Sequence, residues 1–104
     1  MDLQDKNGRQ IRLTDERLAH MEAAHPEMRG QIDRIKDALR EPEQIVRSKS
    51  DPCVELFYRL YASTPVTRKH LCVVVKSLSD ENTFVVTAYF TDKPKRGELL
   101  WETK

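Results

Sequence analysis

Cations that could hold a phosphate gather in the middle of the chain. Residues 56–79 contain no carboxylate, but they carry the basic side chains Arg59, Arg68, Lys69, His70 and Lys76. Arginine and lysine bind phosphate and stabilise the negative charge that builds up when a phosphodiester is cleaved. A histidine or glutamate within reach can take the proton from a ribose 2′-hydroxyl. These residue types favour chemistry on RNA, and a solvated surface with a chance excess of charge is the alternative.

Hydroxyl and aromatic side chains of the predicted strands could complete such a site. Hydroxyl groups can orient a phosphate, and aromatic rings can stack on an unpaired base. The candidates are Tyr61, Thr87, Tyr89 and Thr91, with Lys93 as a further cation that could contact the substrate. The sequence contains no carboxylate cluster typical of a magnesium site and no close pair of cysteines or histidines typical of a zinc site. We therefore expect no metal and no cofactor.

These side chains can act together only if strands bring them to one face of a sheet. From residue 43 the apolar residues alternate, which predicts strands over 44–49, 53–61, 70–77 and 83–91, and a short one over 99–102. The connections between them are too short for a crossover helix, so neighbouring strands should pair antiparallel.

Side-chain alternation then predicts what each face of this sheet carries. Val54, Leu56, Tyr58 and Leu60 should share one face with the other apolar positions, and the helices should cover that face. The opposite face should gather the polar candidates Glu55, Arg59, His70, Lys76, Thr87, Tyr89 and Thr91. On this reading Arg59 and Lys76 belong to one solvent-facing surface.

Two helices are predicted before the strands. Thr14 is a good N-cap for a helix that runs to about Ala24, and Pro26 fits the first turn of a second helix that Pro42 ends. The second helix has an apolar stripe with 3.6-residue spacing, formed by Met28, Ile32, Ile35 and Leu39. Asn7-Gly8 predicts a turn, so residues 1–13 should form an N-terminal arm or hairpin.

Helices followed by strands, without alternation between them, predict an α+β fold. We expect a single domain over 1–104, with a helical part at 14–41 and an antiparallel sheet of four or five strands at 43–103.

The histidines have competing interpretations. His25 lies on the apolar side of the first helix. It can be a packed residue, or it can be a proton-transfer group that reaches round the edge of the sheet. His20 lies one turn after Glu16 and can be a solvated surface residue, and His70 can simply begin a strand. If His25 does not reach the polar face, Glu55 with Arg59 and His70 offers an alternative set on the sheet itself.

Composition narrows the class of protein. The chain has 104 residues and a formal net charge of +1, so one domain fits and long-range electrostatic steering is weak. No apolar run approaches the roughly 20 residues that span a membrane, and residues 1–10 lack the apolar region of a secretory signal. We expect a cytoplasmic protein with free thiols at Cys53 and Cys72.

The order of several segments resembles one family over about residues 11–101. These segments are Leu18-Ala19-His20-Met21, His25-Pro26-Glu27-Met28, Leu56-Phe57-Tyr58-Arg59, Val73-Val74-Val75-Lys76 and Val86-Thr87-Ala88-Tyr89-Phe90-Thr91. The chain is similar to the phage-associated barnase–EndoU–colicin–RelE-like nucleases, the PBECR group of the BECR fold. The resemblance implies metal-independent RNA cleavage by attack of the 2′-hydroxyl, in a toxin or a phage-derived effector.

The resemblance also implies roles for individual residues. His25 and His20 would transfer protons, Arg59 and Lys76 would bind phosphate, and Thr87, Tyr89 and Thr91 would orient it. RNA is the expected partner, and an antitoxin or immunity protein and a second copy of the chain are left open. The alternatives are an inactive module of the same fold that binds RNA or a protein, and a phage-derived structural protein.

Overall fold

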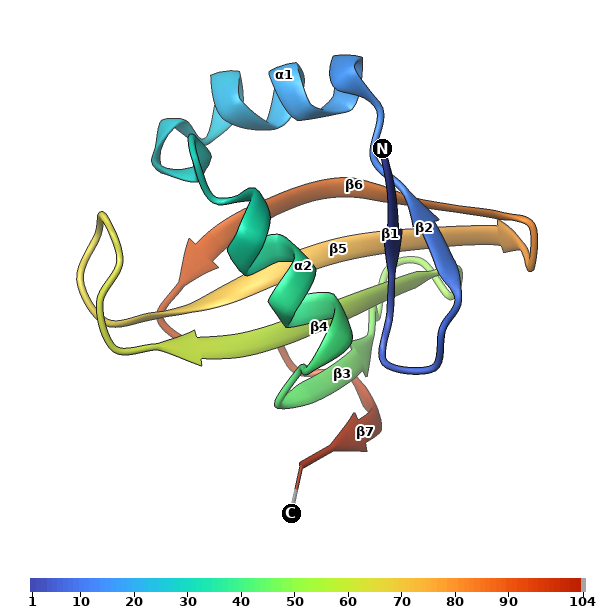
Figure 1. Ribbon diagram of the computed structural model, residues 1–104. Helices are drawn as coiled ribbons and strands as arrows, with labels where there is room; N and C mark the ends of the chain where they lie inside the picture. The colour runs from blue at the N-terminus through green and yellow to red at the C-terminus, as the bar shows by residue number, and fades with distance from the viewer. Residues whose placement is uncertain (104) are drawn as a thin grey trace.

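The centre of the sheet consists of the four strands that alternation predicts. In the computed structural model, which describes residues 1–103, these strands are β3 (Gln44–Arg47), β4 (Val54–Tyr61), β5 (Lys69–Ser79) and β6 (Asn82–Thr91). Within this set, β3 pairs with β4, β4 with β5 and β5 with β6, all antiparallel (Figure 1). The α+β class is confirmed.

The sheet has seven strands instead of the four or five that were predicted. β7 (Glu98–Glu102) pairs antiparallel with β3, as a fifth strand. Residues 1–13 form a hairpin of β1 (Asp2–Gln4) and β2 (Gln10–Arg12), which joins β6 through a single parallel pair between Arg12 and Phe84. The strand order is β1-β2-β6-β5-β4-β3-β7. A three-residue strand that pairs at one position has too few residues for alternation to reveal it.

The first helix begins where its cap predicts, and the second begins later than predicted. In α1 (Asp15–Ala24), the Thr14 hydroxyl accepts a hydrogen bond from the Arg17 N–H at 3.1 Å. Pro26–Met28 forms a separate turn of 3-10 helix, and α2 (Ile32–Arg40) follows it. Gly30 lies between them with a φ of 75°, a left-handed conformation that a continuous helix excludes.

The stripe predicted for the second helix is the part of it that faces the core. Met28, Ile35 and Leu39 are buried, and Ile32 packs against them. Figure 1 shows α2 lying across the sheet and α1 above the edge formed by β6. We call the side that α2 covers the helix face of the sheet, and the other side the open face.

The predicted assignment of β4 to these two faces is wrong. The register aligns Tyr58 with Cys72 and Cys72 with Tyr89, so these three side chains share the open face. Phe57 aligns with Val73 and belongs to the helix-face core. Both parities of β4 carry large apolar residues, so hydrophobicity alone did not specify which one faces the helices.

A bulge in β6 causes a second departure from simple alternation. Val74 pairs with Thr87 and Val75 pairs with Val85, which leaves Val86 without a partner on β5. Val85 and Ala88 therefore both reach the helix-face core, although they are three residues apart. Thr87 and Tyr89 keep their places on the open face.

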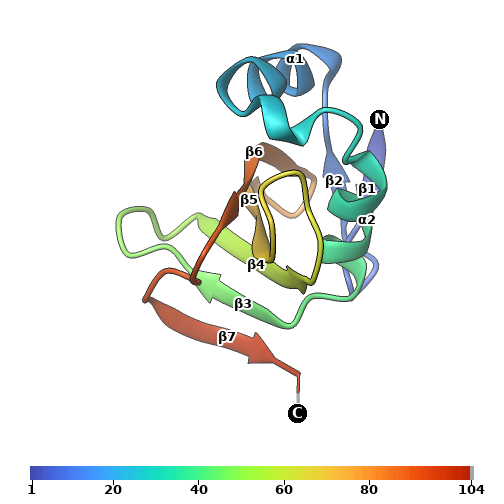
Figure 2. The same ribbon diagram turned by 90° about the vertical axis from the view of Figure 1, so that its left-hand side faces the viewer.

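The open face has a small core of its own. Val46, Leu56, Tyr58 and Cys72 are buried there, against Val54, Val74 and Tyr89. The chain from β6 to β7 passes on this side of the sheet, away from α2 (Figure 2). The Lys95 N–H donates to the buried Tyr58 hydroxyl at 2.9 Å, which anchors this connection over the open-face core.

None of the helices in the described part of the chain is long and apolar enough to cross a membrane.

Candidate functional site

A groove of about 460 Å³ lies on the open face between two loops. Residues 48–51 of the β3–β4 loop line one side of it, and Lys95 and Arg96 of the β6–β7 connection line another. Its remaining walls are formed by side chains of the central strands: Val54, Leu56, Val74, Thr87 and Tyr89. A hollow of this size with an apolar floor and cations at its margin can accept part of an anionic ligand.

His25 lies beside Tyr89, which lines this groove. Its imidazole ring lies with its centroid 5.5 Å from that of the Tyr89 ring, at an interplanar angle of 30°. β2 pairs with β6 only at Phe84, so the remainder of that edge is left for the residues after α1 to approach. His25 therefore contacts a residue of the open face, although it comes from the end of α1.

The position of His25 is fixed by the end of the helix. Its backbone N–H donates to the Met21 carbonyl at 2.7 Å and closes α1, and Pro26 starts the next turn. The Glu27 carboxylate lies 3.6 Å from Nδ1 of the ring. A carboxylate at this nitrogen can orient the ring and leaves Nε2 available for a second partner.

Tyr89 presents a hydroxyl that stays protonated at neutral pH. Burial raises the pKa of Tyr89, and the adjacent Cys72 raises it further. Burial also raises the pKa of the Cys72 thiol to about 11, although the neighbouring Tyr89 and Tyr58 act in the opposite direction. Tyr89 is therefore suited to donate a hydrogen bond to an anion and poorly suited to act as a base.

Lys76 approaches the groove through an ion pair. Its ammonium lies 3.0 Å from Oδ2 of Asp51, a residue of the groove wall. Oδ1 of the same carboxylate accepts the Cys53 N–H at 2.9 Å. This backbone hydrogen bond and the ion pair hold the pKa of Asp51 below its usual value, so the carboxylate remains charged.

His70, Thr91 and Lys93 lie beyond the groove, where β5 begins and β6 ends. His70 aligns with Thr91, one diagonal step from Tyr89 on the open face, which corresponds to about 7–8 Å. The Nδ1 atom of His70 lies 3.2 Å from the Asp92 carbonyl oxygen. The Thr91 hydroxyl donates to the Lys93 carbonyl at 3.3 Å, and the Lys93 side chain is exposed.

Arg59 and Tyr61 lie on the helix face, away from the groove. Arg59 aligns with Leu71, a residue of the helix-face core, and donates from Nη1 to the Glu41 carbonyl at 2.6 Å. The Tyr61 hydroxyl donates to the carbonyl of Arg34 on α2 at 3.3 Å. The prediction that Arg59 and Lys76 share one surface is wrong, because the parity of β4 is the reverse of the one predicted.

The alternative set of Glu55, Arg59 and His70 is wrong for the same reason. Glu55 is on the helix face, where its carboxylate accepts from Arg9 at 2.6 Å, whereas His70 is on the open face. His20 is exposed on α1, 3.9 Å from Glu16, and lies beside a different hollow formed by Thr14 and Arg17. Of the predicted site residues, Thr87 and Tyr89 line the groove. His25 contacts Tyr89, and Lys76 pairs with Asp51 of the groove wall, with His70 and Thr91 nearby on the open face.

The cations of the two loops were not among the predicted site residues. Lys95 and Arg96 lie on the connection after β6, for which alternation makes no prediction, and Lys49 lies in the loop after β3 although the predicted strand 44–49 included it. The run of cations around Pro94, without a carboxylate, was the available signal. Within residues 1–103, no group of three or more histidine, cysteine or acidic side chains could hold a metal ion.

Comparison of the chain with protein-family models, with curated proteins and with solved structures finds no match. The function must therefore be argued from the groove itself.

Proposed function

We propose that the protein is a ribonuclease that cleaves RNA without a metal ion, at the groove of the open face. The observation that carries this proposal is the contact between His25 and Tyr89 at the margin of a groove lined by Thr87, Lys95 and Arg96. A proton-transfer group, a neutral hydroxyl donor and several cations are the parts that cleavage by the 2′-hydroxyl requires. The family resemblance stated above supports the same chemistry.

In the proposed reaction, the ribose 2′-oxygen attacks the adjacent phosphorus. His25 takes the 2′-hydroxyl proton, the bond from the 2′-oxygen to phosphorus forms, and the bond from phosphorus to the 5′-oxygen of the next nucleotide breaks. His70, one diagonal step from Tyr89 on the open face, supplies the proton that the departing 5′-oxygen needs. The products are a 2′,3′-cyclic phosphate and a free 5′-hydroxyl.

The remaining residues stabilise the phosphorane-like transition state. Lys95, Arg96 and Lys76 offset the charge that develops on the phosphate oxygens, and the hydroxyls of Tyr89 and Thr87 donate hydrogen bonds to them. Each donor of this kind typically contributes about 10²–10³ in rate when it is preorganised. Binding of RNA to Lys76 requires that its ion pair with Asp51 open or be shared.

The second candidate function is RNA binding without cleavage. The contacts of two carboxylates favour it, because Glu27 lies 3.6 Å from Nδ1 of His25 and Asp51 forms an ion pair with Lys76. Both groups therefore already have carboxylate partners. Such a module would bind RNA with a strong dependence on salt and leave it intact.

A cleavage assay in EDTA separates the two candidates. Wild-type protein should convert a labelled RNA to fragments that end in a cyclic phosphate, and a substrate with deoxyribose at the cleaved position should stay intact. Tyr89→Phe should reduce the rate, whereas Tyr61→Phe is the matched control because Tyr61 hydrogen-bonds on the helix face. Equal cleavage by wild type and Tyr89→Phe would point to a contaminating enzyme, and bound but intact RNA would establish the binding module.

A further inference from the structure

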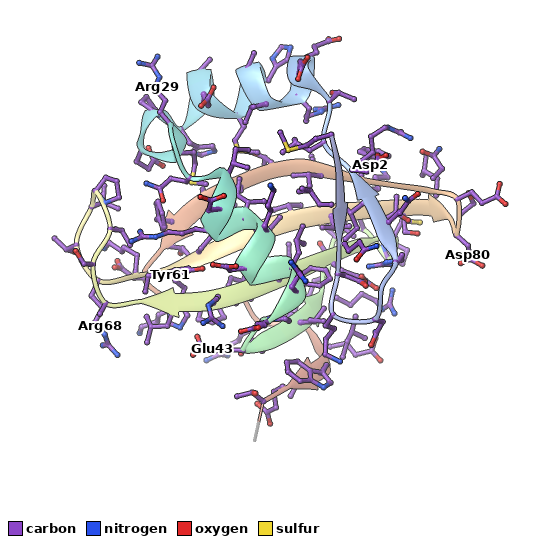
Figure 3. All side chains as sticks on the ribbon, in the orientation of Figure 1. Asp2, Arg29, Glu43, Tyr61, Arg68 and Asp80 are labelled. Atoms are coloured by element: carbon purple, nitrogen blue, oxygen red, sulfur yellow. The ribbon has the colours of Figure 1, made fainter. Side chains whose placement is uncertain are left out.

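A second hollow, of about 560 Å³, lies on the helix side of the sheet, where α2 leads into β3. It is lined by Lys6 of the hairpin turn, Arg40 of α2, Arg59 of β4 and Trp101 of β7, together with Glu41 and Glu43. Figure 3 shows this end of the molecule around Glu43, below α2. We call this hollow the Trp101 pocket, and none of the residues of the groove lines it.

The cations of the Trp101 pocket lack carboxylate partners. Within residues 1–103, Lys6, Arg40 and Arg59 take part in none of the ion pairs of the molecule. Glu43 is engaged elsewhere, because its carboxylate accepts the Leu60 N–H. The three cations outnumber the two carboxylates of the pocket, Glu41 and Glu43, so the pocket has an excess of positive charge that an anion would offset.

Arg59 has an unsatisfied donor at this place. Its Nη1 donates to the Glu41 carbonyl, but its Nε is buried and has no hydrogen-bond partner. Buried donors are nearly always paired, so a small shift of the side chain that let an anion accept from Nε would satisfy it. Guanidinium groups match phosphate oxygens in geometry. The guanidinium is held in place by the Glu41 carbonyl, so it is positioned for an anion before any ligand arrives.

The indole of Trp101 adds an aromatic surface beside these cations. The Lys6 ammonium lies 4.4 Å from the centroid of the ring, and the indole is only partly buried. A planar ring can stack on a half-exposed indole. Lys6 can move from the ring to an anion, because only the cation–π contact and a long hydrogen bond of 3.4 Å to Asn7 Oδ1 hold it there. The pocket thus offers a place for a flat ring next to a place for a phosphate.

We propose that the Trp101 pocket binds a nucleoside monophosphate, with the phosphate on Arg59, Arg40 and Lys6 and the base on Trp101. This site is separate from the groove, so it does not depend on the proposed ribonuclease function. The hollow is within the range of about 300–1,000 Å³ that small-molecule pockets occupy.

Trp101 makes the proposal directly testable, because it is the single tryptophan of the chain. Titration of the whole protein with AMP should change its tryptophan fluorescence with saturation below about 1 mM. Adenosine lacks the phosphate and inorganic phosphate lacks the ring, so each should bind at least about tenfold more weakly than AMP. Equilibrium dialysis with labelled AMP gives the same affinity without relying on fluorescence.

Substitutions then assign the binding to this pocket. Arg59→Gln and Arg40→Gln should each weaken AMP binding about tenfold or more, the loss expected for a charge-assisted hydrogen bond. Arg29→Gln is the matched control, since Arg29 is exposed next to the 3-10 turn and lies outside the pocket. Lys76→Gln should also leave AMP binding unchanged, which separates this pocket from the groove.

Two results would overturn the proposal. One is the absence of saturable AMP binding in both measurements. The other is binding that Lys76→Gln weakens and Arg40→Gln does not, because the nucleotide would then occupy the groove. Arg40 is exposed on the last turn of α2, so its substitution tests the pocket even if Arg59→Gln fails to fold.

Discussion

The rings of His25 and Tyr89 lie 5.5 Å apart, although His25 comes from the end of α1 and Tyr89 from the open face of β6. This contact joins the helical part of the chain to the face of the sheet that the helices do not cover. It brings an imidazole next to a hydroxyl that stays protonated, and the proposed cleavage rests on this arrangement.

Substitution of His25 tests proton transfer. His25→Gln should lower the rate of RNA cleavage by about 10²–10⁴, the usual contribution of a general acid or base. His20→Gln is the matched control, since His20 is exposed on α1 and should leave the rate unchanged. Initial rates on a labelled RNA, with circular dichroism to establish folding, measure both. An unchanged rate in His25→Gln would transfer the role to His70.

Removal of the Asp51 carboxylate tests whether it competes with RNA for Lys76. Asp51→Asn should increase RNA affinity and steepen the dependence of log K on log salt by about 0.7, the value for one further phosphate contact on a single strand. Binding measured at several salt concentrations gives this slope. Asp80→Asn, at the exposed turn between β5 and β6, is the control (Figure 3).

The pH dependence of this effect follows from the lowered pKa of Asp51. The ordinary pKa of this carboxyl is 3.8, and folding lowers it. The carboxylate therefore keeps its ion pair at any pH above 3.8 and loses it as the pH falls below that value. RNA binding by the wild type should therefore show no gain from opening of this ion pair between neutral pH and pH 5. A gain in that range which Asp51→Asn abolishes would contradict the assignment.

Because Cys72 is buried, we expect the protein to lose stability at alkaline pH. Folding raises the pKa of Cys72 from its ordinary value of 9.0 to about 11, so the folded state favours the neutral thiol. That contribution is complete below pH 9 and disappears as the pH rises toward 11. Urea unfolding at successive pH values should show a steeper decline in wild type than in Cys72→Ala. Equal declines would mean that Tyr58 and Tyr89 account for the effect.

The backbone at Gly97 lies too close to β3 for a side chain, so substitution of this glycine should destabilise the protein. A Cβ atom at this position would clash with the Arg47 carbonyl oxygen and would lie 2.7 Å from Cγ1 of Val46. Gly97→Ala should lower the free energy of unfolding by about 1–3 kcal/mol, as overpacking usually does. Thermal or urea unfolding measures this loss. Gly8→Ala is not a suitable control because Gly8 has a positive φ, so the exposed Ser50→Ala serves instead.

Local signals in the sequence predicted most of the elements. The Thr14 cap, the stripe of α2 and the alternation of β3 to β6 each have a cause within a few neighbouring residues, and the structure has them where they were expected. The predicted start of the second helix is wrong. Pro26 is typical of a first helical turn, but no local signal predicts the positive φ of Gly30, which separates the 3-10 turn from α2.

The wrong predictions concern features that depend on contacts between strands and not on neighbouring residues in the sequence. In β4, apolar residues occupy both parities, so the face chosen by Arg59 depends on the register with β5 and not on its own strand. The bulge at Val86 likewise depends on pairing with β5. The groove residues Lys95 and Arg96 lie on a connection that crosses the open face, and strand alternation has no bearing on such a segment.

The strand order also has a consequence for how the chain folds. β3 to β6 are adjacent both in the sequence and in the sheet, whereas β2 must find β6 and β7 must find β3 across most of the chain. Contacts between residues near in sequence close with a smaller loss of entropy and form sooner. We expect the four-stranded meander to assemble first and both termini to dock afterwards, so that the Lys95 N–H reaches the Tyr58 hydroxyl across the open face only when β7 pairs with β3.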